Sequence, residues 1–360
     1  MRRSLTRACA VVLAALALPV LAAGPVAAAK KPATTTTVKL QSTSLSGDGS
    51  TFQKGFNDVA IGYFKQLQKG VSISYQATGS GQGRTDFMNK VVDFAGTDAP
   101  YPASGPAPTD PFLYIPTVVA PITVSYNVSG VSGLKLSADT IAKIFQAQIT
   151  TWNDPAIKAD NPSAKLPSTK ITVVHRSDGS GTTQNFTEFL VKAAPTTWTL
   201  GSASTVQWPA STQGASGNGG VAQLVSTTDG AVGYVDFSDA VAGNLTYAAI
   251  KNSSGKFITP STKSAAVAVA GVTPNPDLTY DPINASGAAA YPITSPTWIM
   301  VYKTQGDAKK GAAIKAFLNF VLGTGTNQGQ KLAATVDYAA LPKTLLGKAK
   351  TAVNSIIVPA

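Results

Sequence analysis

Three short segments of the chain each place glycine and a hydroxyl residue where a predicted helix begins. The segments are Gly49-Ser50-Thr51-Phe52, Gly79-Ser80-Gly81 and Asp178-Gly179-Ser180-Gly181-Thr182. The first N–H groups of a helix have no intrahelical partner and the helix dipole adds partial positive charge, so such turns attract anions. One turn of this kind is more often a plain capped turn. Three of them in one chain favour an anion-binding site.

Two charged residues stand beside these turns. Arg176 precedes the third turn, and its planar guanidinium can hold a tetrahedral oxyanion through two hydrogen bonds. Asp98 follows a predicted strand over 92–96, where sheet folds collect ligands. An ionised carboxylate accepts a hydrogen bond from protonated phosphate but repels fully ionised sulfate, so Asp98 is a candidate selectivity element. The alternatives are a surface ion pair between Arg176 and Asp178, and a capping role for Asp98.

The elements that would position these residues follow an α/β pattern. A helical apolar period over 52–67 precedes an alternating strand at 71–75, and the second turn leads through a polar helix to the strand at 92–96. The same order returns where a strand at 171–175 precedes the third turn. Strand, glycine-rich turn, helix and strand form the unit of parallel sheets. We also expect residues 214–220 to form a glycine-rich loop before a further helix.

The beginning of the chain has the composition of a secretory signal peptide over residues 1–29. Arginines precede an apolar stretch from Ala8 to Ala23, and small residues end the segment before Lys30. The stretch is shorter than the roughly 20 residues of a typical membrane span, although an uncleaved anchor is the alternative. Cys9 stands at the start of this stretch rather than at its end, which argues against a lipoprotein. We therefore predict secretion without a lipid anchor.

Composition narrows the function classes further. Of the 360 residues, 44% are hydrophobic and 13% charged, which is typical of a folded protein. The net charge of +11 is distributed, without a basic run or interleaved aromatic residues, so it favours anions and argues against nucleic acid as a partner. Cys9 is the only cysteine, so we expect no disulfide and no cysteine metal site. Residues 30–46, rich in Thr and Ser, are predicted to be a flexible leader, with folded structure from Gly47.

These motifs closely resemble the phosphate-specific substrate-binding proteins of bacterial ABC transporters. The resemblance runs through GDGSTF (47–52), YQATGSGQG (75–83), VDFAGTDAP (92–100) and VVHRSDGSGTTQNFTEFL (173–190). Supporting stretches are TTWNDPAI, GAVGYVDF, YPITSPTW and DYAALP, so the resemblance covers nearly all of the predicted mature chain.

The resemblance implies a particular set of site residues. The phosphate-binding residues would be Thr51, Phe52, Ser80, Asp98, Arg176, Ser180, Gly181 and Thr182. Asp178 would support the guanidinium of Arg176, and Asp98 would accept the proton of the ligand. The resemblance implies no metal, no cofactor and no catalytic residue. Small departures from the family pattern, none of which removes a predicted donor, are Gln53, Gln82 and Thr97. The missing lipid-attachment cysteine is a more serious departure if the source is Gram-positive.

The implied fold is the two-lobed periplasmic-binding-protein architecture of type II, with the ligand in a cleft between the lobes. Lobe 1 would comprise residues 47–118 and 293–360, and lobe 2 residues 119–292. The implied function is extracytoplasmic binding of inorganic phosphate, by a monomer that is not an enzyme, and its delivery to the membrane permease subunits of an ABC importer. Closure of the lobes would bury the anion.

Two other interpretations of the motifs remain open. One is a receptor for another oxyanion or for a phosphorylated metabolite, which would need an opening beside the anion pocket. The other is a secreted serine hydrolase or phosphatase-like enzyme, because Ser180 lies in a tight turn and His175 is close in sequence. We expect His175, the single histidine, to pack against its lobe instead.

Overall fold

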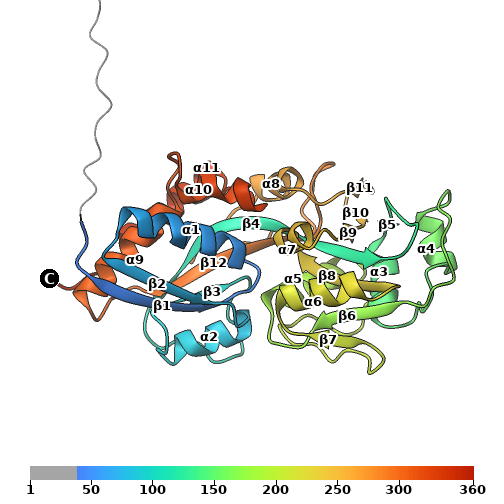
Figure 1. Cartoon of the computed structure of the whole chain (residues 1–360), viewed down its shortest axis with the longest axis horizontal. Helices are drawn as coiled ribbons and strands as arrows, with labels where there is room; N and C mark the ends of the chain where they lie inside the picture. Colours follow the sequence, from blue (N-terminus) through green and yellow to red (C-terminus); the bar gives the residue numbers. More distant parts are fainter. Residues whose placement is uncertain (1–38) are drawn as a thin grey trace, which may run out of the picture. The chain divides into compact units, whose positions relative to one another are not determined.

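In the computed structural model, which describes residues 39–360, one strand of 16 residues runs through the centre of the fold (Figure 1). This strand, β4 (Phe112–Asn127), first pairs antiparallel with β12 (Thr294–Tyr302). From Ile122 onward it pairs antiparallel with β8 (Ala231–Asp236). Because the partner changes between Pro121 and Ile122, two groups of strands share β4 as their common member.

The first group has the strand order β2-β1-β3-β12-β4. Its remaining strands are β1 (Thr43–Gly49), β2 (Val71–Gln76) and β3 (Phe94–Thr97), and β1 pairs parallel with both of the others. The helices are α1 (Lys54–Leu67), α2 (Ser80–Met88), α9 (Ala308–Val321), α10 (Gly329–Leu332), the 3₁₀ helix η1 (Ala333–Val336) and α11 (Lys343–Asn354). Helices α1 and α9 lie on one face and α2 on the other (Figure 1), so both faces of the sheet are covered.

The second group continues from β4 in the order β4-β8-β6-β7, with β9 also paired to β4. Its other strands are β6 (Thr172–Arg176), β7 (Gln213–Ala215) and β9 (Thr246–Tyr247). Its helices are α3 (Ala138–Phe145), α4 (Pro155–Asp160), α5 (Gly181–Ala193), α6 (Gly217–Thr227) and α7 (Phe237–Ala242). A small sheet of β5 (Lys135–Leu136), β10 (Ala249–Lys251) and β11 (Phe257–Ile258) and the helix α8 (Thr262–Ala270) complete the chain.

Local sequence explains why these elements form where they do. In α1, Phe56, Ala60 and Phe64 recur at four-residue spacing and are all buried, so one helix face covers the sheet. Every residue of β8 is buried, as expected for a strand with covered faces. Ser137 caps α3, because its side chain accepts a hydrogen bond from the N–H of Thr140.

Two of the predicted boundaries were wrong. The flexible leader was predicted to extend to residue 46, but β1 begins at Thr43 and pairs with β2 from Val71 onward. The pairing buries Leu45, and this cooperative burial outweighs the local Thr and Ser composition. The loop predicted over 214–220 is also wrong, because β7 runs to Ala215 and α6 already begins at Gly217.

The predicted signal peptide over 1–29, with Cys9, and the first part of the leader lie outside the described residues. Within residues 39–360, no helix combines the length and apolar character needed to cross a membrane. The predicted lobe boundaries, after residue 118 and before residue 293, fall within β4 and just before β12. The lobe boundaries themselves stay a prediction.

Close packing of α2 on β1 depends on a glycine. A Cβ on Gly83 would lie 2.5 Å from the Cα of Gly49 and 3.2 Å from the carbonyl oxygen of Gly96. We expect Gly83→Ala to lower the free energy of unfolding by about 1–3 kcal/mol, because backbone rather than a flexible side chain must move. Urea denaturation measures this change.

Gly62 in α1 supplies the matched control, because a Cβ there meets nothing within 4 Å. Gly62→Ala should raise the free energy of unfolding by roughly 0.5–1 kcal/mol through helix propensity. Equal effects of the two substitutions would contradict the packing argument.

Candidate functional site

The starts of α2 and α5 meet at Asp98, which follows β3. Ser80, the first residue of α2, donates its hydroxyl hydrogen to Asp98 Oδ2 at 3.1 Å. A Cβ on Gly181, the first residue of α5, would lie 2.7 Å from both the Cβ of Asp98 and the Oγ of Ser80. Position 181 therefore admits only glycine without movement, and two helix N-termini reach one carboxylate.

Asp98 is 1% exposed and lies among hydroxyl donors. The Ser50 hydroxyl lies 2.6 Å from Oδ1 and 2.7 Å from Oδ2, and Asn185 Nδ2 donates to the backbone oxygen of Asp98 at 2.7 Å. Burial raises the pKa of the Asp98 carboxyl to about 6, opposed by the hydroxyl hydrogen bonds and by the charge of Arg176. Asp98 is therefore mostly ionised at neutral pH and takes up a proton as the pH falls through about 6. The capping alternative does not describe these contacts.

Arg176 ends β6, and its guanidinium is held on one side only. Its Nε donates to Asp178 Oδ1 at 2.8 Å and its Nη2 pairs with Oδ2. Its Nη1 is buried and has no hydrogen-bond partner within residues 39–360. The Arg176 side chain is 1% exposed, so the alternative of an ordinary surface ion pair is wrong. One edge of the guanidinium is left to donate to a further acceptor.

Asp178 is fastened in turn by the start of α6. The backbone N–H of Gly217 donates to Asp178 Oδ1 at 3.0 Å. Burial would raise the pKa of Asp178, but the hydrogen bonds and charge of Arg176 and the Gly217 N–H together lower it below its usual value. A Cβ on Gly79, just before α2, would lie 2.5 Å from Asp178 Oδ2. The ion pair is thus packed against the turn that carries Ser80.

Thr51 and Thr182 meet on a residue that the sequence analysis did not select. The side-chain nitrogen of Asn218 lies 3.1 Å from the Oγ1 of each threonine. Asn218 follows Gly217 in α6, within the glycine-rich segment that was predicted to be a loop. Its signal in the sequence was a further glycine-rich turn before a helix. Ser50 and Asn185 were also missed, although both stand inside the quoted motifs.

Phe52 and Ser180 complete the set predicted from sequence. The Phe52 ring is fully buried, with its centroid 6.2 Å from that of Tyr338, so the side chain anchors the loop after β1. The Ser180 Oγ accepts from the N–H of Thr183 at 3.1 Å and caps α5. The structure therefore brings the predicted residues together, with Phe52 contributing its side chain to the core.

His175 is positioned away from this chemistry. Its ring stacks on Trp208 with a centroid distance of 5.0 Å, and burial lowers its pKa. It therefore packs against its own side of the molecule, as predicted. Its Nδ1 lies 2.9 Å from the backbone oxygen of Arg176, so the described contacts of His175 are with Arg176 and Trp208 rather than with Ser180. Residues 39–360 hold no group of three or more His, Cys, Asp or Glu side chains suited to a metal ion.

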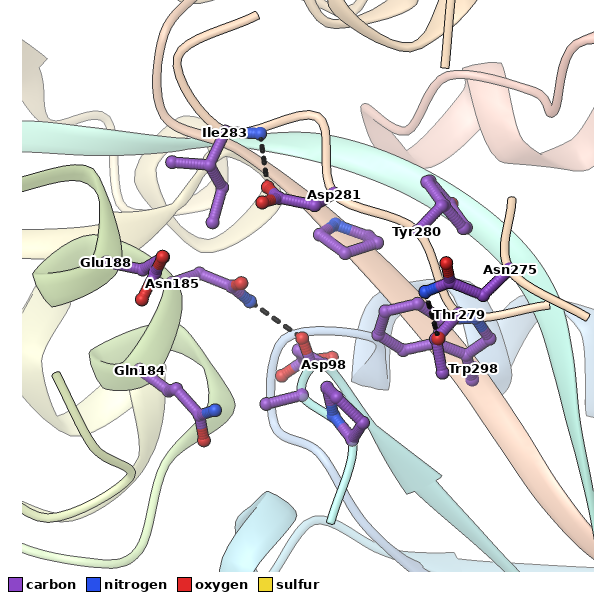
Figure 2. Close-up of a pocket in the computed structure, with 13 residues that line it drawn as sticks. Asp98, Gln184, Asn185, Glu188, Asn275, Thr279, Tyr280, Asp281, Ile283 and Trp298 are labelled. Atoms are coloured by element: carbon purple, nitrogen blue, oxygen red, sulfur yellow. Dashed lines mark hydrogen bonds between the residues drawn. The ribbon is translucent and has the colours of Figure 1, made fainter. Parts of the chain in front are cut away.

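A cavity of about 210 Å³ is lined in part by Asp98 (Figure 2). Among the residues lining it are Asn185, Glu188, Tyr280 and Asp281. Figure 2 shows the bond from Asn185 to the backbone of Asp98 at its edge. Three carboxylates line this cavity, those of Asp98, Glu188 and Asp281, which makes it a poor environment for an anion. Asp98 is shared with the site at the helix N-termini, whereas Glu188 and Asp281 are not among the site residues.

Comparison with known proteins agrees with this geometry. A family model described as a PBP superfamily domain matches residues 30–324. The chain is 36% identical over 326 residues to the phosphate-binding protein PstS2 of Mycobacterium bovis (strain BCG / Pasteur 1173P2), covering 87% of each chain. It is 33% identical over 314 residues to the phosphate-binding protein PstS of Pasteurella multocida, covering 86% of this chain and 89% of that one.

Solved structures agree in fold. A high affinity periplasmic phosphate-binding protein (PfluDING) bound with phosphate matches with a TM-score of 0.70 and 21% identity, over 88% of this chain and 100% of that one. A phosphate-binding protein from Stenotrophomonas maltophilia matches with a TM-score of 0.64 and 22% identity, over 86% and 94% of the two chains. The two-lobed α/β fold of periplasmic binding proteins is thereby confirmed. The chain belongs to the family of bacterial phosphate-binding proteins, as the motifs predicted.

The buried Asp98 carboxyl predicts a pH-dependent stability. Its pKa is about 6 in the folded chain against 3.8 ordinarily, so its contribution to stability is present below pH 3.8 and is lost as the pH rises through 6. The free energy of unfolding of Asp98→Asn should therefore rise relative to that of the native chain between about pH 4 and about pH 7.5. The change should be at most about 3 kcal/mol.

Urea denaturation of the ligand-stripped proteins at both pH values measures this difference. A stability difference that stays constant with pH would contradict the raised pKa of Asp98.

Proposed function

We propose that this protein binds inorganic phosphate outside the cytoplasm and delivers it to the permease subunits of an ABC importer. Membership of the family of phosphate-binding proteins supports the ligand class. The site contains a free guanidinium edge, two helix N-termini and a carboxylate, which together suit an oxyanion that still carries a proton.

The observation that carries this proposal is the unpaired Nη1 of Arg176. A buried charged group with an unpaired N–H donor destabilises the folded protein unless an acceptor binds to it. Asp178 holds the other two nitrogens, so the guanidinium cannot turn away from the site. A tetrahedral anion is an acceptor that fits, because the start of α5 lies against Asp98, which interacts electrostatically with Arg176, and helix N-termini favour anions.

We assign the ligand contacts as follows. Arg176 forms the charge-assisted bonds, Asp98 accepts the proton of the ligand, and Asp178 orients Arg176. The remaining donors are hydroxyl or backbone N–H groups of Thr51, Phe52, Ser80, Ser180, Gly181 and Thr182. A fully ionised sulfate has no proton for Asp98 and meets only repulsion there. The site thus selects phosphate by its protonation state.

We propose that the protein is a monomeric receptor and not an enzyme, secreted without a lipid anchor. The position of His175 on Trp208 supports the absence of a hydrolytic base beside Ser180. The partner change in β4 after Pro121 and the start of β12 at Thr294 support lobe boundaries close to residues 118 and 293. Closure of the lobes about these strands would shut phosphate into the site.

Isothermal titration calorimetry tests the ligand. The chain from Lys30 onward is unfolded and refolded to remove bound anion, then titrated with phosphate and with sulfate. We expect one-to-one phosphate binding and no heat from sulfate. If neither anion gives heat of binding, the site binds another ligand.

Arg176→Ala should weaken phosphate binding by about 2–5 kcal/mol, because a buried charge-assisted pair is lost. Lys158→Ala is the matched control, since it removes the same charge from an exposed position in α4. Calorimetry should find its affinity unchanged. An equal loss in both variants would point to long-range charge rather than to a contact.

Asp98→Asn should reduce the preference for phosphate over sulfate, because the amide can donate to a deprotonated oxygen where the carboxylate only repels it. In the native chain, the same preference should decline as the pH falls through about 6, where Asp98 takes up a proton. Competition titrations at several pH values measure both effects. An unchanged preference in the variant would refute the role of Asp98.

A further inference from the structure

Asn218 contacts two of the hydroxyls that we propose as ligand donors, those of Thr51 and Thr182. It is fully buried at the start of α6. Its backbone N–H donates to Thr51 Oγ1 at 3.3 Å, and its side-chain Nδ2 donates to the same oxygen at 3.1 Å. The second hydrogen of Nδ2 goes to Thr182 Oγ1, also at 3.1 Å.

These contacts determine which way the Thr51 hydroxyl can bond. A hydroxyl has one hydrogen to donate and two lone pairs that accept. Both lone pairs of Thr51 Oγ1 are engaged by Asn218. The hydroxyl therefore has only its hydrogen left, and any further partner must be an acceptor.

The Thr182 hydroxyl is also favoured as a hydrogen-bond donor. One lone pair of its Oγ1 is taken by the amide of Asn218, while its own hydrogen stays free. Thr51 follows β1 and Thr182 opens α5, so a single carboxamide bridges the two groups of strands at the site. The Oδ1 of Asn218 has no hydrogen-bond partner among residues 39–360, and the amide contacts both threonines through its Nδ2.

We propose that Asn218 is a positioning residue that fixes the hydroxyls of Thr51 and Thr182 as hydrogen-bond donors to the ligand. The proposal rests on the function proposed above. Its consequence is that the ligand must present unprotonated oxygens to both threonines. A proton on the ligand is then directed to Asp98, the acceptor in the site, so Asn218 and Asp98 together orient a protonated oxyanion.

The isosteric change Asn218→Asp reverses this arrangement. Both threonine hydroxyls would then donate to the new carboxylate and be lost to the ligand. We expect phosphate affinity to fall about 100-fold or more in this variant, and about 10-fold in Asn218→Ala, where the hydroxyls only become free to rotate. Asn244→Asp, at an exposed position after α7, adds the same charge elsewhere and should bind like the native chain.

A double-mutant cycle separates positioning from simple structural support. In a Thr51→Val, Thr182→Val background there is no hydroxyl to orient, so Asn218→Ala should change phosphate affinity by less than about 2-fold. If Asn218 only held α6 in place, its removal would cost the same in both backgrounds. The cycle carries no added charge, and it decides the question even if Asn218→Asp fails to fold.

Calorimetry with inorganic phosphate on the refolded chain from Lys30 onward serves for every variant. A native chain that does not bind phosphate would overturn the proposed function. If the native chain binds phosphate, two results would overturn the role of Asn218 alone. One is that Asn218→Asp folds and binds phosphate as tightly as the native chain. The other is that Asn218→Ala lowers phosphate affinity equally in both backgrounds.

Discussion

The buried ion pair of Arg176 and Asp178 is the interaction on which the site depends. A guanidinium that is 1% exposed must be compensated, and Asp178 does this with both of its oxygens. Asp178 is itself held by the N–H of Gly217 at the start of α6. Because the pair also packs against Gly79, the positions of α2, α5 and α6 are coupled through one charge. The remaining nitrogen of Arg176 is thereby held in place for the anion that we propose as the ligand.

Close backbone approach is the second constraint. The N–H of Gly81 donates to the carbonyl oxygen of Gly179 at 2.9 Å, which joins the turn before α2 to the turn before α5. A Cβ on Gly81 would lie 2.9 Å from the Cα of Gly179. Glycine in these turns therefore does more than free the backbone for a ligand, since it lets two turns far apart in the chain touch.

The Asp98 carboxylate inside the proposed anion site would be a compromise between stability and selectivity. Burial raises the pKa of Asp98, so its ionised form is unfavourable in the empty folded protein. The hydroxyls of Ser50 and Ser80 and the charge of Arg176 offset part of this cost. What remains favours a ligand that brings its own proton. In the proposed site, the same group that weakens the empty protein would thus distinguish one oxyanion from another.

Much of this protein could be predicted from local sequence, because local patterns encode local structure. The helical period of α1, the cap at Ser137 and the three glycine-hydroxyl turns all depend on neighbours within a few residues. The motifs also indicated the family. The start of β1 at Thr43 could not be predicted in this way, since it depends on pairing with a strand that begins at Val71.

Tertiary structure alone decided how the turns combine. Asn218 joins Thr51 to Thr182 across 167 and 36 residues of sequence, and no spacing in the chain indicates this contact. The raised pKa of Asp98 likewise comes from burial by segments distant in sequence. The sequence by itself determined which residues can donate or accept hydrogen bonds. Only packing decided which lone pairs and charges are already engaged, because that depends on neighbours brought together by the folded chain.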